Sequence, residues 1–517
     1  MEIKYTDGQA IEAAIRKLVL DAPDLSSSVS IASSHYADWA IRYHLCCERA
    51  NLLRPFNFSG LDVLEIGGGM GGLSRYLAEQ AQSLTTVEGA GSRYAVLQSR
   101  LRGLNNWTGI LSNFNDIRLD RKFDVICIVG VLEYAEIYTN TPEGSLKSPF
   151  HHFLKRAWSL LKDDGILLVA IENKLGLKYW NGAVEDHANE LFTGIAGYPL
   201  YKSAKTFSRQ EMVRMLRDEG AKSIDEFFTF PDYKIPSCVL SRSFTARYPE
   251  IATELACYRP FESYTSPRKP FFPDVLALHN LAKSGLFDEF ANSFLFLASR
   301  NKNSLCRRRF LGENNELEEL AWHFSSSRRE PTETVFYSRW DNRLYIEKRR
   351  FANGKKSACF GGNEFFWGAG NPQYLNPHPK LSLALANRAY FQDWRAVSEM
   401  LTGFLAWSFR HWQHPTEPCA LLGSALDAIA TNATIPGDNR EPFELFDLEW
   451  RSGSPVEKSW FLLRNLACLS THRDVLFSEC PMRTLRALYE ALCVHFNIDA
   501  QFDRDILREA GFQAAVS

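Results

Sequence analysis

A glycine-rich loop that directly follows a short apolar segment constrains the fold of this chain more than any other feature. Residues 61–66 form the apolar segment and predict a buried strand, and Gly67, Gly69 and Gly71 follow it. The amphipathic residues 71–82 come next and predict a helix. Because glycine lacks a Cβ atom, the loop can turn sharply and let the backbone approach a ligand closely. A strand, a glycine loop and a helix in this order are typical of the nucleotide-binding unit of α/β proteins.

Apolar runs and amphipathic segments continue to alternate beyond the loop. Further strands are predicted at 84–88, 107–111, 123–129 and 166–171, with helices between them. This alternation predicts parallel strands joined by crossover helices. A helix over 208–220, opened by a capping-box pattern, precedes two more candidate strands at 224–230 and 294–298. We therefore expect a Rossmann-like seven-stranded sheet with flanking helices.

The chain has 517 residues, which is more than a single hydrophobic core usually serves. We expect an N-terminal helical cap over 1–55, an α/β domain over 56–302 and a second, α+β domain over 303–517. In the last of these, short apolar strands replace the alternation, and helical patterns follow at 381–412 and 482–494. The predicted fold class is therefore α/β, followed by α+β.

Charge and cysteine usage exclude several classes of protein. Lysine plus arginine (59) and aspartate plus glutamate (61) nearly cancel, which argues against a nucleic-acid partner. The sequence has no run of eighteen apolar residues and no signal-peptide pattern, so we expect a cytoplasmic protein. The eleven cysteines have no ligand-like spacing, and no metal site is predicted from them.

Polar residues at the ends of the predicted strands indicate the cofactor. Glu65 stands two residues before the first glycine, where its carboxylate would attract a positively charged amino acid end and repel a pyrophosphate. This favours S-adenosylmethionine over NAD. Glu88 ends the second strand, at the usual position of an acid that accepts hydrogen bonds from both ribose hydroxyls. Asn115 and Asp116, after the third strand, are predicted to contact the adenine, and Val131 follows the fourth strand.

The first half of the chain also carries longer motifs. They are Asn51-Leu52-Leu53-Arg54-Pro55, the glycine loop, the run 131–135, the run 171–179, Glu185-Asp186-His187 and the run 230–236. Through them, residues 34–300 resemble class I methyltransferases from bacterial cell-surface polysaccharide loci. The resemblance implies methyl transfer from S-adenosylmethionine to a saccharide or lipid-linked glycan in surface-polysaccharide (O-antigen-type) biosynthesis. Peripheral association with the inner face of the membrane, or with a glycosyltransferase, is compatible with that role.

Several polar residues near these motifs are candidates for the chemistry. Methyl transfer to a hydroxyl requires alignment of donor and acceptor and the removal of one proton. His187 is the first candidate base because imidazole titrates near neutrality. Glu133 and Glu172, just past strand ends, are alternative bases, although either could instead cap a helix or pair with arginine. The predicted substrate-binding residues are Asn173, Lys174 and Tyr179.

The C-terminal part of the chain carries a looser pattern. Asp427 and Asn432 are followed by Asp447, an order that resembles the catalytic loop and metal-binding aspartate of protein kinases and aminoglycoside-phosphotransferase-like kinases. Lys348, at the end of an apolar segment, resembles their nucleotide-binding lysine. The resemblance implies a kinase-like domain that binds ATP and Mg²⁺. Ala425 departs from it, because kinases have histidine at that position.

Three functions therefore stay open on the sequence alone. The first is a methyltransferase that acts on a saccharide or glycolipid. The second is a bifunctional methyltransferase and kinase that caps a glycan chain, and the third is a non-catalytic scaffold or chain-length regulator. The complete set of glycines and acids in the loop favours an enzyme, because a site that no longer binds its cofactor has no reason to keep them.

Overall fold

The structure, a computed structural model, describes residues 6–516 except 36–37, 140–146, 200–203, 265–266, 303, 313–316, 326–331, 340–342, 351–356, 361–362, 368–372, 375–379, 436–441, 446–447, 449, 473–479 and 483. The chain divides into two compact units. The first comprises Met1–Pro249 and Leu255–Phe324, and the second comprises Glu250–Glu254 and Ser325–Ser517.

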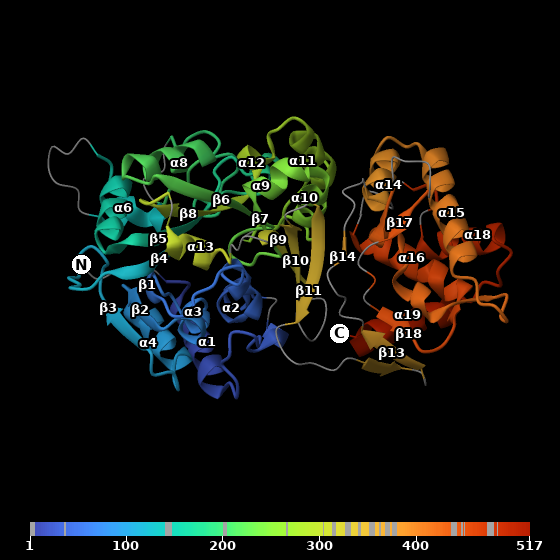
Figure 1. The fold of residues 1–517 in the computed structure, drawn as a ribbon, viewed down its shortest axis with the longest axis horizontal. Coiled ribbons are helices and arrows are strands. Elements are labelled where there is room, and N and C mark those ends of the chain that lie inside the picture. Colours follow the sequence, from blue (N-terminus) through green and yellow to red (C-terminus); the bar gives the residue numbers. More distant parts are fainter. Residues whose placement is uncertain are drawn as a thin grey trace. The chain divides into compact units, whose positions relative to one another are not determined.

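The sheet of the first unit combines a parallel core with antiparallel strands (Figure 1). Its order is β3-β2-β1-β4-β5-β8-β6-β7-β9. The strands are β1 (Asp62–Ile66), β2 (Ser83–Glu88), β3 (Trp107–Leu111), β4 (Phe123–Val129), β5 (Leu161–Glu172), β6 (Ser223–Phe230), β7 (Cys238–Ser241), β8 (Ser293–Ser299) and β9 (Leu317–Ser325). Strands β1 to β5 pair in parallel, whereas β8 is antiparallel to both of its neighbours, β5 and β6. The predicted α/β class is confirmed, and β7 and β9 extend the sheet beyond the seven predicted strands.

Helices cover both faces of this sheet. The helices of this part of the chain are α1 (Gln9–Asp21), α2 (Trp39–Leu45), α3 (Ser74–Gln80), α4 (Gly91–Arg100), α5 (Ala135–Tyr138), α6 (Pro149–Ser159), α7 (Leu177–Trp180), α8 (Arg209–Asp218), α9 (Arg242–Arg247), α10 (Pro249–Ala256), α11 (Asp274–Lys283), α12 (Phe287–Phe290) and α13 (Leu305–Phe310), with short 3-10 turns η1 (Ser33–His35), η2 (Cys47–Leu52) and η3 (Leu132–Tyr134). Most of α10, Glu250–Glu254, belongs to the second unit. In Figure 1, α1, α3 and α4 lie on one side of the strands and α6 and α8 on the other. Strands that are covered on both faces consist of nearly continuous apolar residues. The apolar strands β4 and β5 fit this rule, because they are buried over most of their length.

The boundary between the units differs from the predicted one at residue 303. Helix α13 and strand β9 belong to the first unit, because β9 pairs with β7 and Arg307 forms an ion pair with Asp225 of β6. The predicted cap over 1–55 also belongs to the first unit, where α1 packs on α4. Predicted capping at Ser208 is present: its side chain accepts from the backbone N–H of Glu211, and the Glu211 carboxylate accepts from the backbone N–H of Ser208.

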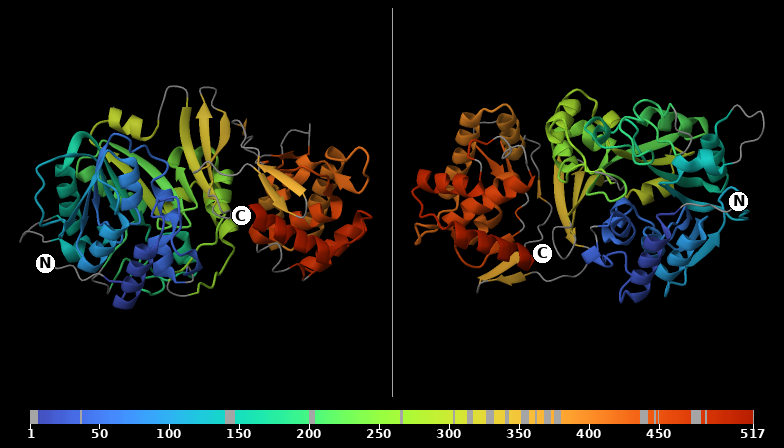
Figure 2. Two further views of the ribbon diagram at one scale, coloured as in Figure 1. Left: turned by 90° about the horizontal axis from the view of Figure 1, so that it is seen from below. Right: turned by 180° about the vertical axis from the view of Figure 1, so that it is seen from behind.

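The second unit consists of small sheets and helices (Figure 2). Its strands are β10 (Thr332–Arg339), β11 (Leu344–Arg350), β12 (Ser357–Phe360), β13 (Asn363–Trp367), β14 (Gln373–Tyr374), β15 (Ala420–Leu421), β16 (Ala433–Thr434), β17 (Glu444–Leu445), β18 (Trp450–Ser452) and β19 (Val456–Glu457). Its helices are α14 (Leu381–Tyr390), α15 (Trp394–His411), α16 (Lys458–His472), α18 (Leu485–His495) and α19 (Phe502–Val516), with 3-10 turns η4 (Gly423–Asp427) and η5 (Ala430–Asn432). The single helix predicted over 381–412 is two helices, because Gln392 adopts a positive φ of 57° and the Asp393 side chain caps a new helix.

The described helices include none with the length and apolar character that a membrane-spanning segment requires.

Candidate active site

The glycine loop lies at the carboxyl end of β1 and has a backbone that only glycine adopts readily. Gly67, Gly69 and Gly71 have φ angles of +81°, +56° and +80°. A Cβ atom on Gly67 would lie 2.4 Å from Cγ2 of Val131, which is far inside van der Waals contact. The loop therefore needs glycine at this position both for its backbone angle and for its packing against the wall formed by Val131.

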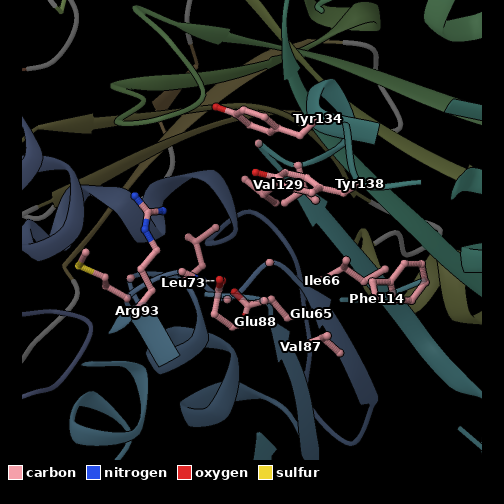
Figure 3. A pocket seen from close by; sticks show the side chains of 18 of the residues that line it. Glu65, Ile66, Leu73, Val87, Glu88, Arg93, Phe114, Val129, Tyr134 and Tyr138 are labelled. Carbon is pink, nitrogen blue, oxygen red and sulfur yellow. Dashed lines mark hydrogen bonds between the residues drawn. The ribbon is translucent and has the colours of Figure 1, made fainter. Parts of the chain in front are cut away.

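A pocket opens beside this loop, at the carboxyl edge of β1, β2 and β4 (Figure 3). The predicted residues that line it are Glu65, Gly67, Gly69, Glu88, Asn115 and Val131. Gly71 is not part of the lining: a Cβ atom there would meet the Arg100 side chain at 3.3 Å, so this glycine permits the packing of the loop on α4. The N-terminal segment also contributes to the lining, through Asp7, Tyr43, His44 and Arg49.

Glu65 is a buried acid within this lining. Its Oε2 accepts hydrogen bonds from Ser74 Oγ at 2.5 Å and from Thr86 Oγ1 at 2.9 Å. Burial is the main reason that the pKa of Glu65 rises to about 7, and the nearby Glu88 charge adds to this effect. The pocket thus has a carboxyl group that changes charge near neutral pH.

Glu88 lies directly at the glycine loop. Its Oε2 accepts from the backbone N–H of Gly69 at 2.7 Å, and its Oε1 accepts from the backbone N–H of Ala90 at 2.8 Å. Figure 3 shows Glu65 and Glu88 close together, with Tyr134 on the other side of the pocket. Two carboxylates therefore stand at the mouth of the glycine loop.

The turn after β3 forms another part of the pocket, together with the rings of Phe114 and Phe153, whose centroids are 5.2 Å apart. Asn115 lines the pocket, but its amide also donates to the backbone oxygen of Tyr138 at 3.0 Å. The prediction for Asp116 was wrong in its placement: the residue is exposed and outside the lining. Its backbone N–H donates to the Asn113 oxygen at 3.0 Å, which closes a turn whose last side chain points outward.

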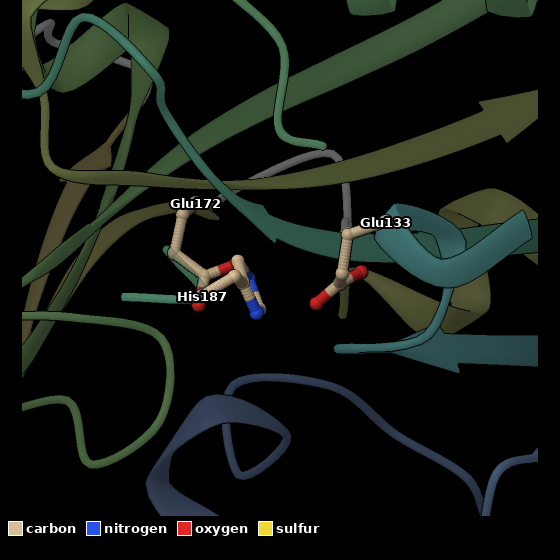
Figure 4. Close-up of side chains that lie close together, drawn as sticks. All are labelled: Glu133, Glu172 and His187. Atoms are coloured by element: carbon tan, nitrogen blue, oxygen red, sulfur yellow. The ribbon is translucent and has the colours of Figure 1, made fainter. Parts of the chain in front are cut away.

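The three predicted bases meet in a second cluster (Figure 4). Glu133 lies in η3 after β4, Glu172 ends β5, and His187 lies in the loop after α7. One ligand-type atom of each lies within 4.8 Å of the others, and His187 Nε2 is 3.9 Å from Glu172 Oε2. We refer to Glu133, Glu172 and His187 as the acid–histidine cluster.

Lysines inside the protein control the charges of this cluster. Lys234 donates to Glu172 and, at 2.8 Å, to Asp186. Burial alone would raise the pKa of Glu172, but Lys234 and His187 outweigh it and hold that pKa well below its usual range. Burial, together with the Glu172 charge, raises the pKa of Glu133 to about 8. Burial would lower the pKa of His187, but Glu172 and Glu133 overcome it and raise the value to about 9.

Tyr134 joins the cluster to the pocket. Its hydroxyl lies 3.1 Å from His187 Nδ1, and its ring packs edge-on against the imidazole at 5.4 Å. The same tyrosine lines the pocket beside the glycine loop. The acid–histidine cluster therefore borders on the pocket rather than standing apart from it.

Two of the three predicted substrate-binding residues have structural roles instead. The Asn173 side chain is fully buried and donates to the backbone oxygens of Glu289 and Ala291, each at 2.8 Å, so no donor remains for a ligand. Lys174 pairs with Glu211 at 2.7 Å and does not line the pocket. Tyr179 is buried, and its hydroxyl has no hydrogen-bond partner among the described residues.

The kinase-like residues are engaged within the second unit. Asp427 is buried, with Oδ1 paired to Arg464 at 2.8 Å and Oδ2 accepting from the backbone N–H of Trp450 at 2.6 Å. The Asn432 amide donates to the backbone oxygen of Asp427. Lys348 lies on β11, opposite Thr334 of β10, and Asp447 lies outside the described residues. A place in a kinase-like catalytic loop, as the resemblance implies for Asp427, does not fit a carboxylate whose two oxygens are both used inside the fold.

Sequence reasoning missed the charged residues that organise the site. Lys234 and Lys178 form ion pairs with Asp186 and Asp232 inside the protein, and Arg49 donates to the backbone oxygens of Tyr233 and Lys234. The available signal was a charged residue within an otherwise apolar motif. Such residues are rarely buried unless they are paired.

Parts of this sequence are similar to known proteins. Residues 39–225 match a family model described as a methyltransferase domain. The chain is similar to the probable (S)-tetrahydroprotoberberine N-methyltransferase 2 of Papaver bracteatum, with 27% identity over 131 residues, 25% of this chain and 32% of that protein. It therefore spans about a third of the length of this curated relative.

Similar solved structures include phosphoethanolamine N-methyltransferase 2 of Haemonchus contortus, at 17% identity and a TM-score of 0.30 over 49% of this chain and 52% of that chain. The N-methyltransferase NodS of Bradyrhizobium japonicum is similar at 19% identity and a TM-score of 0.21, over 24% of this chain and 67% of that chain. The family match, taken with the parallel sheet core and the glycine loop, identifies a class I, Rossmann-like, S-adenosylmethionine-dependent methyltransferase domain in the N-terminal half of this chain.

Proposed function

We propose that this chain transfers a methyl group from S-adenosylmethionine to a hydroxyl of a saccharide or glycolipid intermediate. The observation that carries the proposal is the pocket in which the glycine loop and the carboxylates of Glu65 and Glu88 come together. The acceptor class rests on the sequence motifs of residues 34–300, which resemble those of polysaccharide-modifying methyltransferases.

The residues of the pocket fit this cofactor. At Gly67 a Cβ atom would collide with Val131, so the backbone of the loop stays open to a ligand only with glycine there. Glu88 lies at the same loop, where its carboxylate can accept hydrogen bonds from ribose hydroxyls. Glu65 offers a carboxylate to the positively charged amino acid end, and the rings of Phe114 and Phe153 offer apolar surface to the adenine. When bound, S-adenosylmethionine supplies a methyl group that is activated by its positively charged sulfur.

The chain's own residues must then align an acceptor hydroxyl and remove its proton. The acid–histidine cluster borders on the pocket through Tyr134, and carboxylate oxygens of Glu133 and Glu172 lack hydrogen-bond partners among the described residues. Such oxygens accept hydrogen bonds from a hydroxyl and hold it in one orientation. We therefore place the acceptor in the pocket beside Tyr134, with its hydroxyl directed toward this cluster.

Calorimetric titration with S-adenosylmethionine, followed by transfer of a labelled methyl group to candidate acceptors, tests this function. We expect binding at one site per chain, with label appearing on a nucleotide sugar or a lipid-linked glycan. The acceptor panel should also contain small amines, because the relatives named above are N-methyltransferases. Label on amines alone would overturn the acceptor class, and a folded protein that does not bind S-adenosylmethionine would overturn the function.

Affinity for S-adenosylmethionine should rise with pH through about 7, where the carboxyl group of Glu65 loses its proton. Below this pKa the group is neutral and attracts the cationic cofactor weakly, whereas above it the group is ionised. If only the ionised form binds well, affinity at pH 6 is about tenfold lower than at pH 8. Calorimetry at pH 6, 7 and 8 measures this change.

The Glu65→Gln variant should bind weakly at every pH in that range. Asp116→Asn is the matched control, because this exposed carboxylate lies outside the pocket lining and should leave the pH dependence intact. A Glu65→Gln variant that keeps the tenfold change would assign the titration to another group.

A further inference from the structure

We propose that Glu133, Glu172 and His187 hold a divalent cation of the Mn²⁺ or Zn²⁺ type, which binds the acceptor hydroxyl. This inference rests on the proposed function for the role of the ion, but the binding of the ion can be tested separately. Sequence spacing predicted no metal site, since the three ligands come from parts of the chain that are far apart in sequence.

The geometry of the cluster suits a single ion. One ligand atom of each residue lies within 4.8 Å of the other two, and His187 Nε2 and Glu172 Oε2 are 3.9 Å apart. Bonds of about 2.1 Å from nitrogen and carboxylate oxygen place two ligands of one ion roughly 3–4 Å apart. Small side-chain rotations therefore bring all three atoms to bonding distance. Figure 4 shows the Glu133 carboxylate directed toward Glu172 and His187.

Two buried oxygens in the cluster point to a ligand. The Glu133 and Glu172 residues are 1% and 0% exposed, and the Oε2 atom of each has no hydrogen-bond partner among the described residues. A buried acceptor that lacks a hydrogen-bond partner destabilises the fold, and more so when it is charged. A cation between these oxygens would satisfy both at once.

The charged groups around the cluster can also balance the charge of a divalent cation. The enclosed groups are the carboxylates of Glu133, Glu172, Asp186 and Asp232 and the ammonium groups of Lys178 and Lys234. The Glu185 carboxylate is satisfied separately, by the backbone N–H groups of His187 and Ala188. A histidine ligand binds a metal in its neutral form. An ion that takes the place of the protons on Glu133 and His187 would face four carboxylates and two ammonium groups, and its two positive charges would balance the difference.

Neighbouring residues orient the proposed ligands. His187 Nδ1 is hydrogen-bonded to the Tyr134 hydroxyl at 3.1 Å, so Nε2 is the nitrogen that faces the carboxylates. Lys234 donates to Oε1 of Glu172, which leaves Oε2 directed toward His187. Hydrogen bonds of this kind fix the orientation of metal-ligating histidines and carboxylates.

The donor set limits the choice of ion. Carboxylates suit Mn²⁺ and Mg²⁺, imidazole suits Zn²⁺ and similar transition metals, and a mixed set therefore favours Mn²⁺ or Zn²⁺ over Mg²⁺ or Ca²⁺. Three protein ligands leave coordination positions open, as in catalytic rather than structural sites. An acceptor hydroxyl bound at an open position becomes more acidic and releases its proton to water more readily.

Titration of the chelator-treated full chain with Mn²⁺, followed by electron paramagnetic resonance of the free ion and by calorimetry, tests the site. We expect one Mn²⁺ per chain, displaced by Zn²⁺, and at least a tenfold loss of Mn²⁺ affinity in Glu133→Gln and Glu172→Gln. Glu133→Gln is the first choice because Glu172 also pairs with Lys234, so replacing Glu172 removes an ion pair of the fold as well as a ligand. Glu136→Gln is the matched control, since this exposed residue three positions away pairs with Lys205 outside the cluster.

Binding of S-adenosylmethionine to the same samples separates this inference from the proposed function. Wild type, Glu133→Gln and Glu136→Gln should bind S-adenosylmethionine within about twofold of one another in the absence of metal. A wild-type chain that binds S-adenosylmethionine but retains neither Mn²⁺ nor Zn²⁺ overturns the metal site alone. Equal Mn²⁺ affinity in both glutamine variants and wild type overturns the assignment of the ligands. Metal binding without S-adenosylmethionine binding overturns the proposed function instead.

Discussion

The Gly67→Ala variant is expected to bind S-adenosylmethionine at least about 100-fold more weakly than wild type, which corresponds to roughly 2.7 kcal/mol. Alanine at this position must adopt a φ of +81°, and its Cβ atom would lie 2.4 Å from Cγ2 of Val131. The positive φ alone costs about 1 kcal/mol. The contact with Val131 adds the larger effect, because relieving it requires movement of the loop or of the pocket wall. Either movement displaces groups that would contact the cofactor.

Gly103→Ala is the matched control for this variant. Gly103 has a φ of +82°, lies outside the pocket lining and has no atom within 4 Å of an added Cβ. The control shares the backbone strain without the contact, so we expect lower thermal stability and unchanged affinity in calorimetry. Adding Val131→Ala to Gly67→Ala removes the atom in conflict and should restore at least about tenfold of the affinity. Wild-type affinity in Gly67→Ala would show that the loop does not hold the cofactor.

Replacement of Arg464 by methionine is expected to destabilise the second unit by about 3–5 kcal/mol. The Arg464 guanidinium is buried and pairs with Asp427 at 2.8 Å and with Glu509 at 2.7 Å. Without it, two buried carboxylates lose their shared cation. Urea denaturation followed by circular dichroism should show earlier unfolding of the second unit, while affinity for S-adenosylmethionine in the first unit stays unchanged.

Arg395→Met is the matched control for the second unit. Arg395 forms an ion pair with Glu399 on the exposed face of α15, and water screens this interaction. We expect no measurable change in the urea midpoint. An unfolding curve for Arg464→Met that coincides with that of wild type would show that the buried network is not essential for stability.

The buried ion pairs of Arg464 with Asp427 and Glu509 also concern the kinase-like hypothesis, because Asp427 is one of its predicted residues. Asp427→Asn keeps the size of the side chain and an oxygen for the backbone N–H of Trp450, but its amide nitrogen faces the Arg464 guanidinium, so circular dichroism must first establish that the variant folds. ATP and Mg²⁺ as ligands of the second unit have no support from Asp427, because Arg464 and Trp450 engage both of its oxygens. Loss of Mg²⁺-dependent ATP binding in a folded Asp427→Asn protein would restore the bifunctional hypothesis.

The sequence by itself determined the elements of the parallel core and the loop that joins β1 to α3. The strands predicted at 107–111 and 123–129 coincide with β3 and β4 residue for residue, and the other predicted strand starts and ends of this sheet mostly lie within one residue of those in the structure. The exception is β5, which begins at Leu161 rather than at residue 166. Continuous apolar runs and glycine positions can be recognised within a short stretch of sequence. The first indicates a strand that is buried on both faces, and the second indicates a residue with a positive φ.

Only the tertiary structure decided which polar side chains meet. Glu172 belongs to the acid–histidine cluster, whereas the side chain of the adjacent Asn173 donates to the backbone oxygens of Glu289 and Ala291. No pattern in the sequence predicts these different roles. Lys234 reaches Glu172 because β8 inserts antiparallel between β5 and β6 and brings the segment after β6 to the same edge of the sheet. Side-chain neighbours follow from strand order and chain crossing, and these are set by packing of the whole core rather than by local sequence.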